Sequence, residues 1–155
     1  MMRRALLGLA TLFHVSLPAV SQTTQAKAAA PAAGPSLYKR LGGYDAIAAV
    51  SDDFVVRLVT DKQVGRFLVG LSDSSKARLR QNFVDFVCQA TGGPCVYVGR
   101  DMKTSHKGLG ITGSDWDLSV KLFVETLDKF KVPQREKDEL IAAVASLKAD
   151  IVEKP

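Results

Sequence analysis

The stretch TGGPCVYVGRDMKTSHKGLGIT, from Thr91 to Thr112, decides how the rest of this sequence is interpreted. It is the least periodic part of a chain whose other segments repeat apolar residues at helical spacing. It contains His106, with Met102 four residues before it. Three cations accompany them: Arg100, Lys103 and Lys107. A lone imidazole on a short irregular segment between amphipathic segments predicts a bound prosthetic group.

Composition and charge are those of an ordinary globular domain rather than a nucleic-acid-binding one. The 155 residues are 46% hydrophobic and 24% charged, which is enough apolar chain for one domain with a sizeable core. The net charge is +5, but the basic residues are scattered and alternate with acids, as in residues 134–139, which we expect on a solvated helix face. Nucleic-acid binding needs a clustered basic stripe, so we expect no nucleic-acid partner. Asp52 and Asp53 diverge by about 100° on a helix, so we expect both to face solvent.

The N-terminal segment has the pattern of a cleavable secretory signal peptide. Residues 1–21 begin with Met-Met-Arg-Arg, continue with an apolar run and end in Ala19-Val20-Ser21. The run is short for a membrane span and contains Pro18, although a retained anchor is the alternative. Once this segment is cleaved, we expect no stable insertion into a membrane. The signal peptide therefore predicts a periplasmic or secreted protein. Cleavage would also remove His14, and His106 would be the only histidine left.

The remaining chain divides into a linker and one helical domain. Residues 22–35 are rich in Ala and Pro and predict a flexible linker, so the domain is expected at 36–155. Four long segments repeat apolar residues at helical spacing, and none alternates as a strand would. We expect them at about 44–60, from Ser74 or Ser75 to 90, at 112–130 and from Pro133 to 151. Thr112-x-x-Asp115, at the start of the third, resembles a capping box. A short turn at 37–41 and a corner at 61–71, with Phe67 and Leu68 facing inward, complete an all-α domain.

His106 could serve a haem, which needs one axial imidazole, flat apolar walls and cations near its two propionates. Aromatic residues of the predicted helices could form the walls: Phe54, Phe67, Phe83, Phe86 and Trp116. The three cations near His106 could supply the charge. The same apolar stripes would also build an ordinary core, so a helical domain without haem stays an alternative.

The string Gly108-x-Gly110-x-x-Gly113 matches the dinucleotide-binding fingerprint only as letters. That fingerprint requires a preceding strand and a βαβ unit, and neither is predicted here. We therefore expect no nucleotide, and interpret the glycines as a tight turn between a short histidine-bearing helix and the next helix.

Cys88 and Cys95 are the only cysteines, and the predicted export favours a disulfide between them. The alternative is two buried thiols. Two thiols and one histidine are too few for a typical structural metal site. Cysteine-histidine catalysis is disfavoured, because Cys95 lies in a glycine-proline turn without an orienting partner.

Residues 36–152 resemble the group I truncated haemoglobins. The matching pieces are Leu37-Tyr38-x-Arg40-Leu41-Gly42-Gly43, Asp53-Phe54-Val55-Val56-Arg57, Phe67, Gly92-Gly93-Pro94-x-x-Tyr97-x-Gly99 and Met102-x-x-x-His106-x-x-x-Gly110-Ile111-Thr112. The resemblance implies a two-over-two antiparallel helical sandwich around haem b. It also implies that His106 binds the iron, on the side called proximal.

The resemblance assigns further residues to the walls of the haem site. On the proximal side it places Met102, Ile111 and Trp116. At the haem edge and the corner of the opposite, distal side it places Phe54, Phe67 and Leu68. Over the iron on the distal side it places Leu79 and Phe83, and near the propionates Tyr97 and Lys103.

Two distal positions depart from the family pattern. Many relatives carry a tyrosine where this chain has Val55, and often a glutamine where it has Phe83. An apolar distal pocket provides no hydrogen bond to bound dioxygen, so we expect fast oxygen release and a relative preference for CO or NO. Gln81 or Asn82 could partly replace the missing bond if either side chain turned inward.

We therefore expect a haem protein that reversibly binds a diatomic gas: O2, CO or NO. The alternative is an enzyme that uses the same haem for NO dioxygenation or peroxide chemistry. Turnover would need an external reductant such as a periplasmic electron donor, because the chain has no flavin or nicotinamide domain. A haem carrier or redox protein is a third class.

Overall fold

A computed structural model describes residues 34–154, and all its regular elements are helices. In chain order these are α1 (Leu37–Arg40), α2 (Tyr44–Thr60), the 3-10 helix η1 (Val64–Leu68), α3 (Asp73–Ala90), α4 (Met102–His106), α5 (Gly113–Lys129), α6 (Gln134–Ala145) and α7 (Lys148–Ile151). The all-α prediction is confirmed. The predicted signal peptide and residues 22–33 of the predicted linker lie outside the described residues. Within 34–154, every helix is too short or too polar to cross a membrane.

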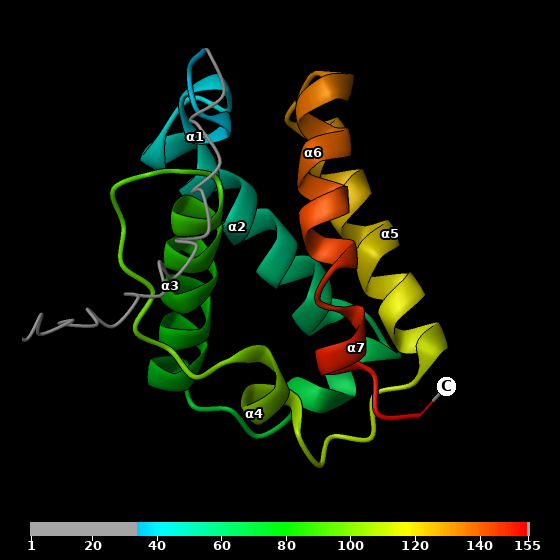
Figure 1. The fold of residues 1–155 in the computed structure, drawn as a ribbon. Helices are drawn as coiled ribbons and strands as arrows, with labels where there is room; N and C mark the ends of the chain where they lie inside the picture. Colours follow the sequence, from blue (N-terminus) through cyan, green and yellow to red (C-terminus); the bar gives the residue numbers. More distant parts are fainter. Residues whose placement is uncertain (1–33, 155) are drawn as a thin grey trace, which may run out of the picture. The chain divides into compact units, whose positions relative to one another are not determined.

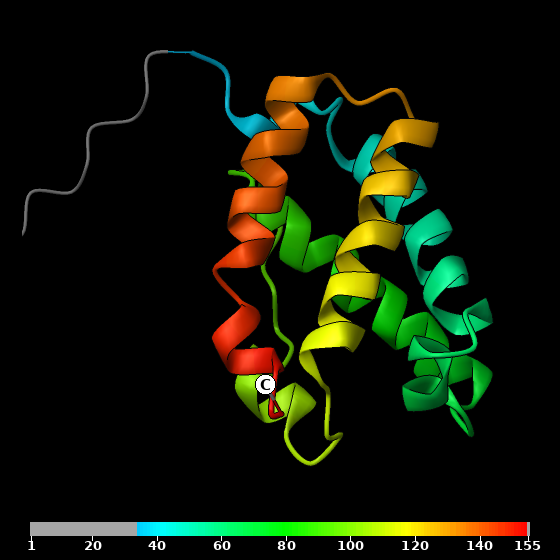
Figure 2. The same cartoon turned by 90° about the vertical axis from the view of Figure 1, so that its right-hand side faces the viewer.

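Two antiparallel helix pairs, α2 with α3 and α5 with α6, form the domain (Figure 1). α2 contacts both α3 and α5 and so joins the two pairs. Figure 2, turned by 90°, shows α5 beside α6, with α7 following α6 and lying against α4. This is the predicted two-over-two arrangement.

The main core lies where the two helix pairs meet and is rich in phenylalanine. Phe54 of α2 is buried, and its ring centroid lies 5.1 Å from that of Phe83 and 5.0 Å from that of Phe123. Leu127 of α5 and Leu140 of α6 complete the buried cluster. Burying one such side chain contributes about 1.5–3 kcal/mol, so this cluster fixes how the two pairs pack.

Side-chain caps set where the long helices begin. α5 begins as predicted, because the Thr112 hydroxyl accepts the N–H of Asp115 while the Asp115 carboxylate accepts the N–H of Thr112. The cap of α3 is Ser72 and not the predicted Ser74 or Ser75. The Ser72 hydroxyl accepts the N–H of Ser75 at 3.2 Å, which starts the helix earlier than predicted.

The predicted last helix, ending at Ile151, is in fact two helices. α6 ends at Ala145, and the N–H of Leu147 then donates to the Val144 carbonyl at 2.9 Å in a tighter turn. The break redirects the chain, so that α7 contacts α4 instead of continuing along α5. Helical periodicity alone could not reveal this change of direction.

The corner after α2 buries different residues from those predicted. η1 buries Val64 and Gly65, whereas Phe67 and Leu68 are only half-buried. Gly65 is required there, because a Cβ atom would lie 2.8 Å from the carbonyl oxygen of Val59. The corner packs closely on the end of α2, and Phe67 and Leu68 keep uncovered apolar surface.

Asp53 ties α2 to α5, although the sequence predicted that it faces solvent. Its carboxylate accepts hydrogen bonds from Arg57 at 2.7 Å, from the Thr126 hydroxyl at 3.2 Å and from the Lys129 ammonium. These bonds, led by the one from Arg57, lower the pKa of Asp53 to about 2. Its neighbour Asp52 is exposed, as predicted.

A second ion pair lies in the run 134–139, which the sequence placed on a solvated face. Glu136 is buried, and its carboxylate accepts a hydrogen bond from Arg40 at 2.9 Å. Glu139 of the same helix pairs with the same guanidinium. The two carboxylates hold α1 against α6, which corrects the prediction for this run.

Candidate functional site

His106 ends α4, a helix of five residues. Its Nδ1 lies 2.7 Å from the carbonyl oxygen of Met102, and a carbonyl only accepts hydrogen bonds. Nδ1 therefore carries the proton, and in the neutral ring the lone pair is on Nε2. Nε2 has no hydrogen-bond partner among residues 34–154, and the ring is half-buried. The Nε2 lone pair is therefore able to bind a metal ion, because the hydrogen bond at Nδ1 keeps the proton on Nδ1.

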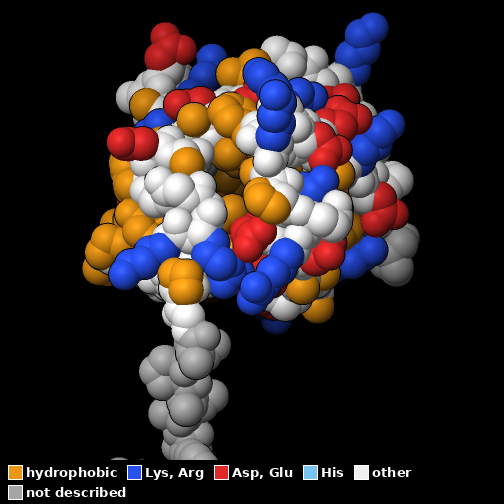
Figure 3. All heavy atoms as spheres, turned by 90° about the horizontal axis from the view of Figure 1, so that it is seen from above, with side chains coloured by type: hydrophobic (Ala, Val, Ile, Leu, Met, Phe, Trp, Pro, Cys, Tyr) orange, Lys and Arg blue, Asp and Glu red, His pale blue; other side chains and the backbone are white. Residues whose placement is uncertain are grey.

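Several large apolar side chains around the core are incompletely covered by protein. The Phe83 ring packs against Phe54 and Phe123, yet Phe83 is only half-buried, as are Leu79 and Val87 on the same helix. Figure 3, the view from above, shows a recess with hydrophobic atoms at its floor. Half-covered apolar side chains present the kind of surface against which the flat face of a haem packs. These residues fit the haem that the sequence suggested.

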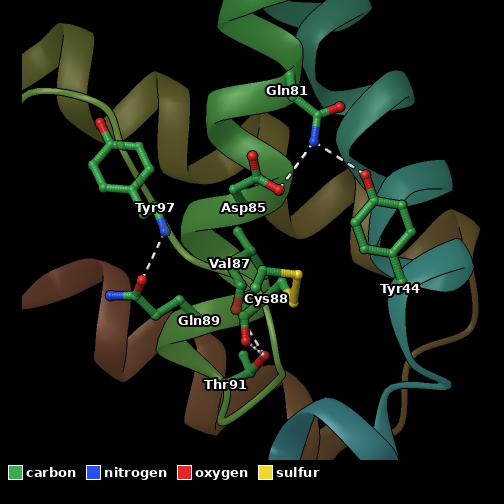
Figure 4. The surroundings of a disulfide bond; sticks show 9 residues. Tyr44, Gln81, Asp85, Val87, Cys88, Gln89, Thr91 and Tyr97 are labelled. Atoms are coloured by element: carbon green, nitrogen blue, oxygen red, sulfur yellow. Dashed lines mark hydrogen bonds between the residues drawn. A yellow bond between two sulfur atoms is a disulfide. The ribbon is translucent and has the colours of Figure 1, made fainter.

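The distal residues are apolar in the structure as in the sequence. Val55 of α2 is half-buried, like Phe83 and Leu79 of α3. The Gln81 amide donates to the Tyr44 hydroxyl at 3.0 Å and to the Asp85 carboxylate at 2.9 Å (Figure 4). Both amide hydrogens of Gln81 are therefore used in these bonds.

The residues predicted on the His106 side differ in burial. Ile111 and Trp116 are each 8% exposed and belong to the buried residues of the domain. Met102 is half-buried at the start of α4. Lys103 is exposed and has no ion-pair partner among the described residues, so its ammonium is available to an anionic group.

A polar network that the sequence did not predict joins η1 to the start of α5. The Asp115 carboxylate accepts hydrogen bonds from Arg66 at 2.8 Å and from the Gln63 amide at 2.9 Å, in addition to those from Thr112. Burial raises the pKa of Asp115, but the bonds from Gln63, Thr112 and Arg66 outweigh it, and the pKa lies well below its ordinary value. The Arg66 guanidinium also lies over the ring of Phe67, 4.4 Å from its centroid.

The connection from α3 to α4 is closed by a disulfide between Cys88 and Cys95, whose Cα atoms lie 5.7 Å apart (Figure 4). The favoured prediction is therefore confirmed over two free thiols. Cys88 is fully buried. Gly93 crosses directly over it, since a Cβ atom there would lie 2.7 Å from the Cys88 sulfur and 2.5 Å from the Tyr38 ring. Only glycine allows this approach.

Tyr97 stiffens the same connection. Its ring packs edge-on against Phe86, with centroids 5.4 Å apart, and its hydroxyl donates to the Arg100 carbonyl at 2.6 Å. Its N–H donates to the Gln89 side chain at 2.7 Å. The hydroxyl that the resemblance placed near a propionate is thus bonded within its own loop.

The glycine string after His106 is a tight turn, as predicted. Gly108 and Gly110 have φ angles of +84° and +67°, which side chains disfavour. Their N–H groups donate to the two carboxylate oxygens of Glu153, each at 2.6 Å. In a nucleotide-binding loop such N–H groups would face a phosphate, whereas here the protein's own carboxylate takes that place.

The two-over-two fold, with the one histidine of residues 34–154 on a short helix, defines a truncated globin. The chain is similar to the group 1 truncated hemoglobin GlbN of Mycolicibacterium paratuberculosis, at 34% identity over 116 residues, 75% of this chain and 83% of that protein. It is 33% identical to the group 1 truncated hemoglobin GlbN of a Synechocystis species, over 72% of this chain and 88% of that protein.

Solved structures show the same similarity. The 2/2 hemoglobin from Synechococcus sp. PCC 7002, in the cyanomet state and with covalently attached heme, has a TM-score of 0.69 and 29% identity over 77% of this chain and 100% of that one. The Fe(III) truncated hemoglobin from Tetrahymena pyriformis shares the fold, with a TM-score of 0.71, 23% identity and the same coverage. The Bacterial-like globin family model matches residues 36–153. This chain therefore belongs to the bacterial-like globin family, which implies a bound haem.

Three polar residues around the site were not predicted: Gln63, Arg66 and Glu153. Only their hydrogen-bond partners carried a signal. Thr112-x-x-Asp115, which contains the acceptor of Gln63 and Arg66, has the form of a capping box, and the glycine string, which contains the donors to Glu153, has the form of an anion-binding turn. Their donors and acceptors lie 43 to 52 positions away in the chain, so no local pattern pairs them.

Proposed function

We propose that this globin binds haem b through Nε2 of His106 and reversibly binds a diatomic gas, O2, CO or NO, on the opposite side. The observation that carries the proposal is the hydrogen bond from His106 Nδ1 to the Met102 carbonyl, because it leaves the Nε2 lone pair for a metal. Membership of the globin family and the half-covered apolar side chains support it.

The chain's own residues would hold the group and exclude water from it. Haem iron bound by one imidazole supplies an open coordination position for a gas molecule. Leu79 and Phe83 would cover the distal side, and Ile111 and Trp116 would add apolar surface on the His106 side. The exposed ammonium of Lys103 would pair with a propionate.

His106→Ala tests the ligand assignment. Wild-type protein should purify with, or be reconstituted to, a Soret band that shifts between the ferric, ferrous and CO-bound forms. The His106→Ala variant should lose the imidazole-ligated spectra, and added imidazole should restore them. A wild-type protein that cannot be reconstituted with haem would contradict the proposal. Variant spectra identical to those of the wild type would contradict the ligand assignment.

The distal chemistry favours rapid oxygen release. Val55 and Phe83 have no hydrogen-bond donor, and the amide hydrogens of Gln81 are bonded elsewhere. The side chain of the half-buried Asn82 has no hydrogen-bond partner among residues 34–154 and is the remaining candidate donor. One good distal hydrogen bond is worth about 1–2 kcal/mol, which is roughly 5- to 30-fold in oxygen affinity. Bound CO and NO depend less on such a bond, so the chain should retain them better relative to O2.

Phe83→Gln should supply the missing donor. We expect oxygen to dissociate about 5- to 30-fold more slowly from this variant, with a much smaller change for CO. Stopped-flow measurement of both dissociation rates checks this, with the thermal midpoint as a control for the loss of the Phe83 ring from the core. Oxygen release from the wild type that is slower than from tyrosine-bearing relatives would overturn the apolar-pocket explanation.

We also propose that the protein is exported to the periplasm or secreted, and that residues 1–21 are removed. The charged start and apolar run of this segment support export. The Cys88–Cys95 disulfide supports it too, because structural disulfides persist in oxidising compartments. Mass spectrometry of the mature N-terminus tests the cleavage, and an intact Met1 would contradict it.

A further inference from the structure

Residues 148–154, which we call the C-terminal strap, fold back onto the turn that follows His106. Glu153 accepts the N–H of Gly108 at one carboxylate oxygen and the N–H of Gly110 at the other, both at 2.6 Å. The positive φ angles of both glycines turn alternate N–H groups to the same side, which forms a concave anion site. The anion that fills the site is part of the same chain.

Backbone hydrogen bonds bring Glu153 to this turn independently of its side chain. The N–H groups of Glu153 and Lys154 both donate to the Ile111 carbonyl, at 2.9 and 3.1 Å. The N–H of Gly113 donates to the Lys154 carbonyl at 3.0 Å. α7, the helical part of the strap, lies against α4 in Figures 1 and 2. The strap therefore contacts both α4 and the turn that leaves it.

α4 depends on such contacts because it is too short to be stable alone. Isolated helices of five residues do not persist in water. Asp101 caps its beginning by accepting the N–H of Thr104 at 2.8 Å. At its end the N–H of Leu109 donates to the His106 carbonyl at 3.2 Å, so the glycine turn starts directly on the histidine backbone. The His106 ring is tied to the Met102 carbonyl, and its direction follows the backbone of α4.

We propose that Glu153 is a positioning residue for haem binding. By holding Gly108 and Gly110, its carboxylate fixes the turn after His106 and thereby the direction in which Nε2 meets the iron. The inference rests on the proposed function, in which His106 is the iron ligand. It adds Glu153, 47 positions after His106 in the chain, to the Met102 carbonyl as a group that supports the ligand.

Glu153→Gln is the sharpest test, because glutamine keeps the shape of the side chain. Its amide has one oxygen that can accept a hydrogen bond and one NH2 group that would face an N–H donor. We expect the variant to lose haem to excess apomyoglobin about 3- to 10-fold faster than the wild type, below the 10- to 100-fold typical of residues that contact a ligand directly. The iron–imidazole stretching band of the ferrous protein should also shift in resonance Raman spectra.

Glu125→Gln is the matched control. It removes the same charge and breaks a surface ion pair with Arg57, in which the two atoms lie 3.1 Å apart, but Glu125 belongs to α5 and not to the strap. Its haem loss rate and Raman band should equal those of the wild type. Amide hydrogen exchange gives a second measurement, since Gly108 and Gly110 should lose protection in Glu153→Gln while the long helices keep theirs.

The outcomes separate this inference from the proposed function. If the wild type and the control hold haem and Glu153→Gln matches them in loss rate and Raman band, Glu153 does not position the ligand. If only the thermal midpoint changes, Glu153 is purely structural, and the inference is equally wrong. If the wild type itself binds no haem, the proposed function fails first.

Discussion

The two connections that enter and leave α4 are held in opposite ways. Residues 91–101, which lead into it, are fixed by the Cys88–Cys95 disulfide and by the contact of Tyr97 with Phe86. Residues 107–112, which lead out, are held by hydrogen bonds to the exposed carboxylate of Glu153 and to backbone groups. The entry connection, residues 91–101, is thus closed by a covalent bond, whereas the exit connection, residues 107–112, is held by hydrogen bonds. One end of the histidine helix therefore depends on a covalent bond, and the other depends on hydrogen bonds alone.

Removing the Cys88–Cys95 disulfide should have one of the two largest effects on stability. The double variant Cys88→Ala/Cys95→Ala opens a loop of about eight residues, which lowers the free energy of unfolding by roughly 2–3 kcal/mol in the chain-entropy model. Urea unfolding followed by circular dichroism measures the change. Wild-type protein treated with a reductant should shift by a similar amount. An oxidised wild type that unfolds at the same urea concentration as the double variant would remove the distinction between the two ends.

Two glycine substitutions compare how closely the two connections are packed. In Gly93→Ala the new Cβ would lie 2.7 Å from the Cys88 carbonyl oxygen, a collision with the backbone in the entry connection. We expect a loss of about 2–3 kcal/mol. In Gly108→Ala nothing lies within 4 Å of the new Cβ, and only the φ angle of +84° opposes it. That strain costs about 1–2 kcal/mol.

Thermal unfolding of both alanine variants measures these costs. Gly70→Ala is a matched control, because it also has a positive φ, +81°, and open space, but lies in the corner before α3. It should resemble Gly108→Ala. Equal losses at Gly93 and Gly108 would contradict the conclusion that the entry is packed and the exit open.

Acid should weaken the ion pairs of Asp53 and Asp115 and leave the disulfide intact. The pKa of Asp53 is lowered to about 2 and that of Asp115 lies lower still, both below the ordinary value of 3.8. A carboxyl whose pKa is lower in the folded state stabilises fully above its unfolded value and loses that contribution as the pH falls through the folded one. The free energy of unfolding should therefore be nearly constant above pH 5 and fall from about pH 4 towards pH 2.

Urea unfolding across this pH range measures the trend. Asp53→Asn should flatten the part of the decline that ends near pH 2, because asparagine does not titrate. A wild-type stability that rises on acidification below pH 4 would contradict the sign of this prediction.

Local patterns predicted the elements but not the contacts between distant ones. The stripes of α2, α3 and α5, the Thr112–Asp115 cap and the glycine turn followed from residues within a few positions of one another, where helix geometry restricts the choices. The break before α7 could not be predicted in this way. It depends on packing against α4, which the chain reaches only in the folded state.

For single residues, the main error was to predict that certain charged side chains face solvent when they contact other helices. Asp53 and Glu136 lie in charged stretches that suggest solvent, yet each meets a cation from another helix: Lys129 for the first, Arg40 for the second. For the site, motif and chemistry led to the prediction that His106 and its apolar surroundings hold the haem, and this stays a prediction. The polar shell of Arg66, Gln63 and Glu153 depends on long-range pairing that sequence periodicity does not encode.

The sequence separation of the disulfide has a consequence for the order of folding. Cys88 and Cys95 are seven positions apart, whereas Glu153 and Gly108 are separated by 45. Closing a short loop costs less chain entropy than closing a long one, and it is faster. Once oxidised, the chain therefore has the approach to the histidine helix in place before the long-range contacts form. The strap closes only after α5 and α6 have brought it back, so the turn after His106 should be among the last parts to become rigid.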